Sequence, residues 1–274
     1  MSMSSMMQRR RMLIAAATAG GSIDVTTLPI TYTGNMTDEI VTMGDGNQYR
    51  LLTFTSSGTL TIAQPVVADI WLCGGGANGI GASGSVGGAG GGGGFVGSIY
   101  KTKIGTTVSC VVGAATGSSS FGSIVSANGA NSPNGGSGGG ARGYDWDSPP
   151  GTGAGISTYP FLDTTYFPNQ PHCAGGGGGS TFFRTSSQWR GGTGGSNGSD
   201  GGNYVNETAG NGGDGGLYGG GLGGWEGANG RNGYHYGSGG GGGGFDGSSD
   251  EYGAGGAGYQ GVIYARIPLD QKAA

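Results

Sequence analysis

The chain has 274 residues, of which 72 are glycine, and its formal net charge is −4. This acidic balance argues against nucleic acid or an anionic membrane surface as a partner. No run of 18 apolar residues is present, so the sequence predicts no membrane insertion. Three widely spaced cysteines argue against a disulfide framework, and the apolar surroundings of Cys73 and Cys110 predict buried thiols there.

Residues 1–22 are predicted to form an N-terminal docking peptide. A cluster of arginines precedes a short apolar run in a Met-rich segment, and that run is short for a signal peptide. Chain ends are mobile unless something ties them down, so we expect this segment to bind a partner protein. An uncleaved signal or a frayed tail is the alternative. The residues expected to carry the docking are Arg9, Arg10, Arg11, Met12 and Leu13.

Residues 23–130 and 261–268 are predicted to form a β-sandwich. Short β-branched or aromatic stretches alternate there with Gly, Asn and Asp, which is typical of strands and turns. The expected strands are 23–32, 39–43, 50–55, 59–62, 68–73, 95–101, 107–113, 121–127 and 261–267. The stretch TFTSSGTLTI predicts a hairpin with its turn at 56–58. The last strand returns after a long insertion, so the insertion must fold back on itself.

Residues 131–260 form this insertion, and the first glycine run, 74–94, is expected to join it. All but six of the glycines lie at or after residue 74, in runs interrupted mainly by Ala, Ser, Asn and Asp. Disorder is one interpretation, because glycine loses the most backbone entropy on folding. We favour a bundle of polyglycine-II helices, in which every backbone group finds a partner on a neighbouring strand. The predicted fold class is mainly β, with little α-helix: a jelly-roll-like β-sandwich with an inserted bundle of left-handed polyglycine-II helices.

Aromatic side chains between the glycine runs are the main functional signal. If each run crosses the bundle once, loops 141–174, 203–209 and 245–252 fall at its far tip. Tyr and Trp offer large rigid contact areas with a polar group, which suits recognition surfaces. The alternative is that these rings cap the ends of a bundle that has no side-chain core. The candidate receptor-binding residues are Tyr144, Asp145, Trp146, Asp147, Tyr159, Phe161, Tyr166, Phe167, Tyr204, Phe245 and Tyr252.

The motifs associated with catalysis or cofactors carry little weight here. The G-x-G-x-x-G match at 79–84 is expected by chance in a segment that is one-third glycine, and no helix pattern follows it. The histidines, His172 and His235, lie among loop aromatics and do not complete a triad pattern. An acidic loop at 246–251 is better explained as solvated than as a calcium site. We therefore predict no enzyme activity, no cofactor and no metal, with a surface glycan hydrolase as an alternative.

Several motifs in a fixed order resemble a known family. They are YRLLTFTSSGTLTI, ADIWLCGGGANG, GGAGGGGGFVGSIYKTKIGTTVSCVVGAA, SSSFGSIVSANGA and the terminal GVIYARI, which together span roughly residues 45–268. They resemble the glycine-rich domain of bacteriophage and prophage tail proteins. The glycine-rich part of anaplastic lymphoma kinase receptors is similar, with a jelly-roll-like sandwich and polyglycine helices. Some phage tail-fibre adhesins also display loops on a polyglycine bundle.

The resemblance implies a virion protein, assembled in the bacterial cytoplasm and exposed outside the cell. The expected role is a tail-fibre or tail-tip adhesin that attaches to a host-surface glycan or protein. The alternative is a purely structural head-fibre, collar or baseplate protein whose glycine bundle packs on other virion chains. The expected partners are other virion proteins, bound through the N-terminus, and further copies of the chain, with a trimer as one possible state.

Overall fold

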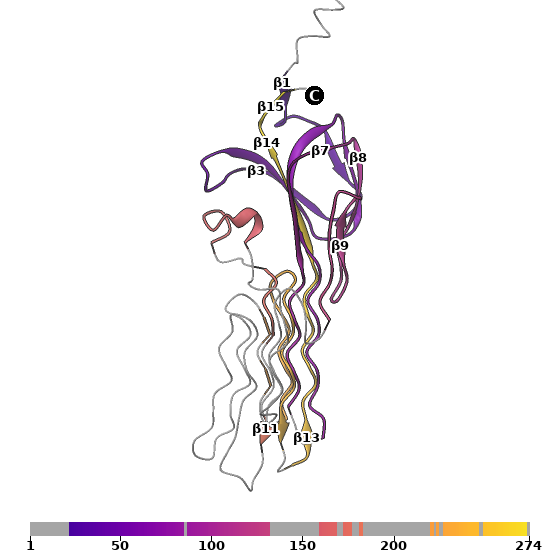
Figure 1. Ribbon diagram of the computed structural model, residues 1–274, viewed down its shortest axis with the longest axis vertical. Helices are drawn as coiled ribbons and strands as arrows, with labels where there is room; N and C mark the ends of the chain where they lie inside the picture. The colour runs from indigo at the N-terminus through magenta and orange to yellow at the C-terminus, as the bar shows by residue number, and fades with distance from the viewer. Residues whose placement is uncertain are drawn as a thin grey trace, which may run out of the picture.

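The computed structural model describes residues 22–84, 87–131, 159–168, 172–176, 181–182, 220–221, 223–224, 227–246 and 249–272. Figure 1 shows a β-sandwich at one end of an elongated molecule, with extended segments running to the opposite end. At that far end lie β11 (Thr181–Phe182) and β13 (Glu251–Tyr252). The prediction of a mainly β fold is confirmed, and the helical residues of the described chain are the 3-10 turn η1 (Pro160–Leu162).

Two antiparallel five-stranded sheets form the sandwich. One has the order β10 (Val125–Ala127), β9 (Ser119–Phe121), β8 (Thr107–Val111), β5 (Gly58–Ile62) and β2 (Ile30–Tyr32). The other, called here the outer sheet, has the order β3 (Met36–Thr42), β4 (Gln48–Phe54), β14 (Val262–Pro268), β6 (Val66–Cys73) and β7 (Val96–Ile104). Smaller sheets pair β1 (Ser22–Asp24) with β15 (Asp270–Lys272), and β12 (Phe245–Asp246) with β11 and β13.

The last long strand, β14, lies in the middle of the outer sheet. Its Ile263 is opposite Phe54 of β4 on one side and Leu72 of β6 on the other. The sequence predicted that this strand pairs with earlier ones, and it does so after the whole glycine-rich insertion. The two ends of the insertion meet at the same end of the sandwich, because the Ala130 N–H donates to Gly75 O and Val262 pairs with Cys73.

The outer sheet is covered on both faces because its side chains alternate between two hydrophobic clusters. In β6, Ile70 and Leu72 enter the core between the two sheets, whereas Trp71 and Cys73 face the opposite side. That second cluster also holds Phe161 and Phe167 from the glycine-rich insertion. A segment of the insertion thus packs on the sandwich itself.

Two expected strands are each broken by a turn. Within 23–32, the Asp24 carboxylate accepts hydrogen bonds from the Thr26 N–H (3.0 Å) and the Thr27 hydroxyl (2.9 Å), and a turn separates β1 from β2. Within 121–127, Gly122 adopts φ +55° between β9 and β10, a conformation that side chains disfavour. Asx turns and a positive-φ glycine therefore override the local strand propensity.

The predicted hairpin at 56–58 is wrong. β4 pairs with β3 and β14, while β5 pairs with β2 and β8, so the turn carries the chain from one sheet to the other. The alternating pattern of TFTSSGTLTI is equally compatible with both arrangements. Only the pairing partners distinguish a hairpin from a crossover between sheets.

The glycine-rich segments hydrogen-bond to one another with a period of three residues. The N–H of Gly240 donates to Ala77 O, and that of Gly243 donates to Ile80 O, both at 3.0 Å. Gly241 and Gly244 donate in the same way to residues 231 and 228, and Gly239 donates to residue 174. Segment 238–244 accepts in turn from residues 88 and 91, from residues 221 and 224, and from residues 253 and 256. Segment 238–244 is therefore buried among six other segments, and Gly239, Gly240 and Gly243 have no room for a side chain.

Asparagine side chains replace backbone partners at the surface of this bundle. The Oδ1 atom of Asn229 accepts from the Ala254 N–H at 2.7 Å, and Asn232 Oδ1 accepts from Ala257 at 2.8 Å. Asn78 Oδ1 accepts from Gly258 at 2.9 Å. The same three-residue period relates the first two asparagines. They supply side-chain acceptors to backbone N–H groups of segment 254–258.

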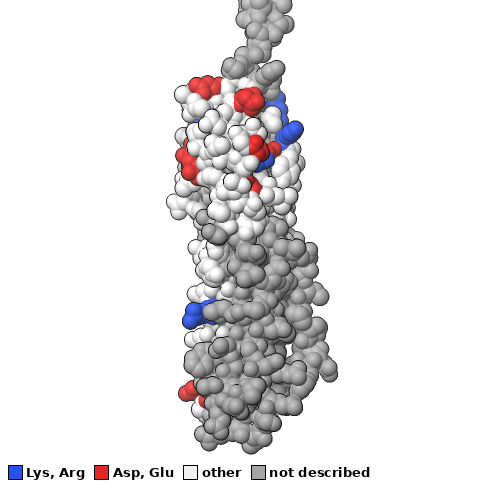
Figure 2. Space-filling model, turned by 90° about the vertical axis from the view of Figure 1, so that its left-hand side faces the viewer, with Lys and Arg blue, Asp and Glu red and all other residues white. Residues whose placement is uncertain are grey.

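Within the part of the chain that the structure describes, charged side chains concentrate on the sandwich. Figure 2 shows acidic and basic groups over that end and few on the described part of the glycine-rich bundle. Among the described bundle residues, the charged ones are Arg231, Asp246, Asp250 and Glu251. No helix in the described ranges is both long and apolar enough to cross a membrane.

Candidate functional site

Residues 159–168 lie across the outer face of the outer sheet and are held by Asp163. Its carboxylate accepts from the Gly44 N–H (2.8 Å) and from the N–H groups of Thr165 and Tyr166 (2.9 Å each). Burial acts to raise the pKa of Asp163, but these backbone donors outweigh it and hold the pKa below its ordinary value. The ionised Asp163 therefore both shapes the loop and ties it to the turn after β3.

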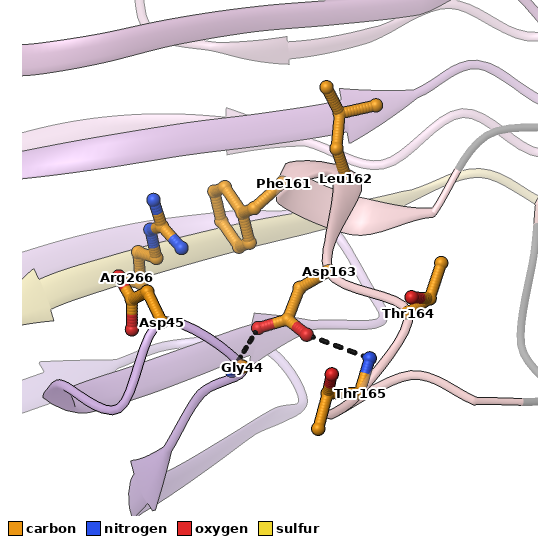
Figure 3. Close-up of a pocket in the computed structure, with 8 residues that line it drawn as sticks. All are labelled: Gly44, Asp45, Phe161, Leu162, Asp163, Thr164, Thr165 and Arg266. Atoms are coloured by element: carbon orange, nitrogen blue, oxygen red, sulfur yellow. Dashed lines mark hydrogen bonds between the residues drawn. The ribbon is translucent and has the colours of Figure 1, made fainter.

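A cation lies beneath the loop. The Arg266 guanidinium is 4.5 Å from the ring centre of Phe161 and 4.7 Å from that of Tyr49. Its Nε atom donates to Asp69 Oδ2 at 2.8 Å. The cation–π contacts and the ion pair fix Phe161 on the sheet. Figure 3 shows this ring beside Arg266, with Asp163 bonded to Gly44 nearby.

A hollow of about 340 Å³ opens between the loop and the turn after β3. It is lined by Gly44, Asp45, Phe161, Leu162, Asp163, Thr164, Thr165 and Arg266, as Figure 3 shows. Asp45 is itself held by the Asn47 N–H (2.9 Å) and the Tyr49 hydroxyl (2.7 Å), which, in that order of effect, lower its pKa. The hollow therefore combines ionised carboxylates, hydroxyl groups and one apolar wall, a lining suited to a polyol or sugar.

Leu162 is the exposed apolar group at the rim of this hollow. Its side chain is 77% exposed, and both Phe161 and Leu162 adopt left-handed backbone conformations, with φ of 56° and 57°. Such conformations cost roughly 1–2 kcal/mol per residue for side chains other than glycine. The packing of Phe161 and the bonds of Asp163 offset this strain, and the result is an apolar side chain held in solvent.

A second hollow of about 290 Å³ lies on the other side of the loop. Its lining includes Glu39, Tyr166, Phe167, Tyr236 and Tyr264. The Tyr166 hydroxyl donates to Glu39 Oε1 at 3.0 Å, and burial, followed by this hydrogen bond, raises the pKa of Tyr166 to about 12. Phe167 packs edge-on against Tyr264, with ring centres 5.3 Å apart. Two hollows thus flank one anchored aromatic loop.

Beneath the second hollow, His172 is buried in an aromatic cluster. Its Nε2 atom lies 3.0 Å from the Tyr264 hydroxyl, and the two rings are stacked with an interplanar angle of 3°. Burial, with a smaller contribution from His235, lowers the pKa of His172 to about 3, so the imidazole is neutral at physiological pH. Within the described ranges, no three His, Cys, Asp or Glu side chains come together in a way that would hold a metal ion.

The predicted receptor-binding residues fall into three groups. Phe161, Phe167 and Phe245 are buried, and Tyr159 and Tyr166 are half-buried. Tyr252, which packs against Phe245 with ring centres 5.0 Å apart, is 50% exposed at the far end of the bundle. The others lie outside the described residues: Tyr144, Asp145, Trp146, Asp147 and Tyr204, together with the docking residues Arg9, Arg10, Arg11, Met12 and Leu13.

The position of residues 159–168 corrects the predicted topology. Loop 141–174 was expected at the far tip of the bundle, but residues 159–168, which form most of its described part, pack beside β3, β4 and β14 on the sandwich. Phe161 and Phe167 are buried there because Arg266 of the outer sheet contacts the Phe161 ring and Tyr264 contacts the Phe167 ring. Their rings cover the sheet, which neither the recognition nor the bundle-capping interpretation anticipated.

Several residues of the site were missed by sequence reasoning. They are Glu39, Asp45, Leu162, Asp163, Thr164, Thr165 and Arg266. The run Asp163-Thr164-Thr165 carried a usable signal, because an Asp that accepts from the N–H two residues later is a common turn motif. Glu39, Asp45 and Arg266 carried none, since they reach the site only through strand pairing.

Comparison with protein-family models and with curated proteins found no match to this chain.

Proposed function

We propose that this protein is a non-enzymatic bacteriophage virion protein, a tail-fibre or tail-tip adhesin that attaches to a glycan or protein of the host surface. The glycine-rich segments are proposed to be left-handed polyglycine-II helices inserted into a jelly-roll-like sandwich. The N-terminal segment is proposed to dock the protein on other virion chains, with a homo-oligomer as the assembled form.

The observation that carries the proposal is the hydrogen-bond network around segment 238–244. Its donors and acceptors recur every three residues and reach six other segments, as a packed polyglycine-II bundle requires. Such a bundle is rigid without a hydrophobic core, because each segment is bonded along its length to its neighbours. A stiff body that carries surface loops suits a protein whose task is to reach and hold a surface.

One observation favours the structural alternative. Three of the aromatic side chains expected to bind a receptor, Phe161, Phe167 and Phe245, are buried within the chain. Rings that stabilise the fold do not recognise a host. In a head-fibre, collar or baseplate protein, the bundle would pack against other virion chains, and exposed loops would not be needed.

Binding of the purified full-length chain to bacterial cells and to surface polysaccharides tests the proposal. Wild type should bind saturably, and Leu162→Ser should weaken binding about tenfold, which corresponds to about 1.4 kcal/mol. Leu162 is suitable because its exposed side chain borders the polar hollow and supports no core contact. Phe161 and Phe167 are unsuitable, because their replacement would damage the outer sheet.

Two further variants locate or refute the activity. Val111→Ser on β8 is the matched control, since Val111 is 44% exposed in the opposite sheet and should leave binding unchanged. Tyr252→Ser probes the far end of the bundle. If wild type binds no bacterial surface tested, the adhesin proposal fails and the structural role replaces it.

A further inference from the structure

Two of the three cysteines, separated by 100 positions in the sequence, meet where the sandwich joins the glycine-rich bundle. Cys73 is the last residue of β6, and Cys173 lies in the short segment that follows the anchored loop. Both are buried, with exposures of 0% and 1%, and both are free thiols. They belong to the same cluster on the outer face of the outer sheet.

Gly237 shows that the two sulfur atoms lie beside the same residue. A Cβ atom placed on Gly237 would lie 2.7 Å from Cys173 Sγ and 3.1 Å from Cys73 Sγ. Both sulfurs therefore occupy the space beside one glycine, which adopts φ +72°. The side chain of Cys73 also contributes to the raised pKa of Cys173. The small size of glycine here leaves room for the pair.

The third cysteine is separated from this pair by the sheet. Cys110 lies on β8 and contributes to the core between the two sheets. Successive side chains of β6 alternate, so Leu72 enters that core while Cys73 faces away from it. A bond between Cys73 and Cys110 would have to cross the outer sheet.

We propose that Cys73 and Cys173 form an intramolecular disulfide when the protein meets a disulfide oxidant, while Cys110 remains a thiol. Nothing in the attachment role requires this bond, so finding or not finding the disulfide would not test the proposed function. The bond would close a loop of about 100 residues and fix the segment that follows residues 159–168 to the end of β6.

The reaction balances with glutathione disulfide as the oxidant. The Cys173 thiolate attacks one sulfur of glutathione disulfide, which breaks that S–S bond and releases one glutathione thiolate. The Cys73 thiolate then attacks the Cys173 sulfur of the mixed disulfide and releases the second glutathione. Two electrons pass to glutathione, and the two cysteine protons end on the two glutathione thiols.

Burial controls how fast this happens. The pair is closed to solvent, and burial, followed by the interaction with the Cys73 side chain, raises the pKa of the Cys173 thiol well above its ordinary value. Thiolate is the reactive form, so the folded protein resists oxidation until segment 172–176 opens. Oxidation during folding avoids this barrier, because neither thiol is yet buried.

The test refolds the full-length protein in a buffer of oxidised and reduced glutathione. Free thiols are then alkylated under denaturing conditions, and the cysteines are mapped by mass spectrometry. We expect one alkylated cysteine, Cys110, and one cross-linked peptide pair that joins Cys73 to Cys173. Reduction before alkylation should restore labelling at all three. The melting temperature of the oxidised protein should exceed that of the reduced protein by roughly 5–10 °C.

Two variants sharpen the result. Cys110→Ala retains the pair and should show no alkylation after oxidative refolding. Cys73→Ala should show alkylation at both remaining cysteines. Alkylation of all three cysteines in the refolded wild-type protein would overturn the proposal. So would a disulfide that contains Cys110, or stable glutathione adducts on Cys73 and Cys173.

Discussion

At the scale of single residues, the segments of the glycine-rich bundle can pack closely because glycine has no side chain. A Cβ atom on Gly243 would lie 1.9 Å from the carbonyl oxygen of Gly253, and one on Gly240 would lie 2.1 Å from that of Gly256. Real contacts of this kind are never so short, and backbone atoms cannot turn aside as side chains do. Glycine at these positions is therefore a steric requirement.

Gly243→Ala should lower the free energy of unfolding by roughly 2–4 kcal/mol, because the new methyl group forces segment 253–256 away and breaks its hydrogen bonds. Chemical denaturation followed by circular dichroism would measure the change. Gly105→Ala is the matched control, since nothing lies within 4 Å of its Cβ position. Equal stability of both variants would show that the bundle can accept a methyl group at position 243.

At the scale of elements, the sheets and the glycine-rich segments are stabilised differently. Strands of the sandwich bury side chains such as Phe54 and Ile263, whereas segment 238–244 buries its own backbone. Each buried N–H and C=O of such a segment needs a partner, since an unpaired one costs about 1–3 kcal/mol. Asn229 and Asn232 supply that partner at the bundle surface.

Asn232→Ala should destabilise the adjoining segment, because the Ala257 N–H loses its acceptor. Water can reach this exposed site, so we expect a loss of only about 1 kcal/mol. Hydrogen exchange should show faster exchange at the Ala257 amide. Asn232→Asp keeps an acceptor oxygen and serves as the control. Unchanged exchange in the alanine variant would mean that the side chain does not hold this segment.

At the scale of the whole molecule, His172 joins the sandwich to the glycine-rich bundle. Its ring stacks on Tyr264 of the outer sheet and contacts Tyr236, which precedes the buried segment 237–245. Three elements distant in sequence therefore pack around one neutral imidazole. Protonation of this ring would place a charge inside an apolar cluster.

Global stability should therefore fall as the pH falls below about 6.5. The unfolded chain binds a proton at His172 near pH 6.5, whereas the folded chain does so only near pH 3. Between these values the unfolded state holds more protons, so the free energy of unfolding falls by up to about 1.4 kcal/mol per pH unit. Carboxylates with lowered pKa values, such as Asp45 and Asp163, add to this loss only below about pH 4.

Denaturation of His172→Gln at pH 7, 5.5 and 4.5 would measure this effect. The variant should lose most of the slope, because glutamine does not titrate and can still bond to the Tyr264 hydroxyl. His235→Gln is the comparison variant. The pKa of His235 is also lowered by burial, but its ring is only half-buried, so this variant should lose less of the slope than His172→Gln. A slope unchanged in His172→Gln would assign the pH dependence to other groups.

The sequence by itself determined the mainly β fold, most strand positions and the burial of Cys73 and Cys110. These features depend on local patterns: alternation in stretches such as 66–73, and glycine runs that exclude a helical or side-chain core. Strand ends were shifted by a few residues, and two strands were broken where Asp24 and Gly122 make turns. Such turns are local too and were open to prediction.

Apart from the return of the last strand to earlier ones, only the tertiary structure decided which segments are neighbours. It placed 159–168 on the sandwich, brought Glu39, Asp45 and Arg266 to the candidate site, and set Cys73 beside Cys173. It also buried Phe161 and Phe167, which the sequence presented as loop aromatics. The reason is physical: exposure and proximity depend on pairings between residues far apart in the chain, and local propensity carries no information about them.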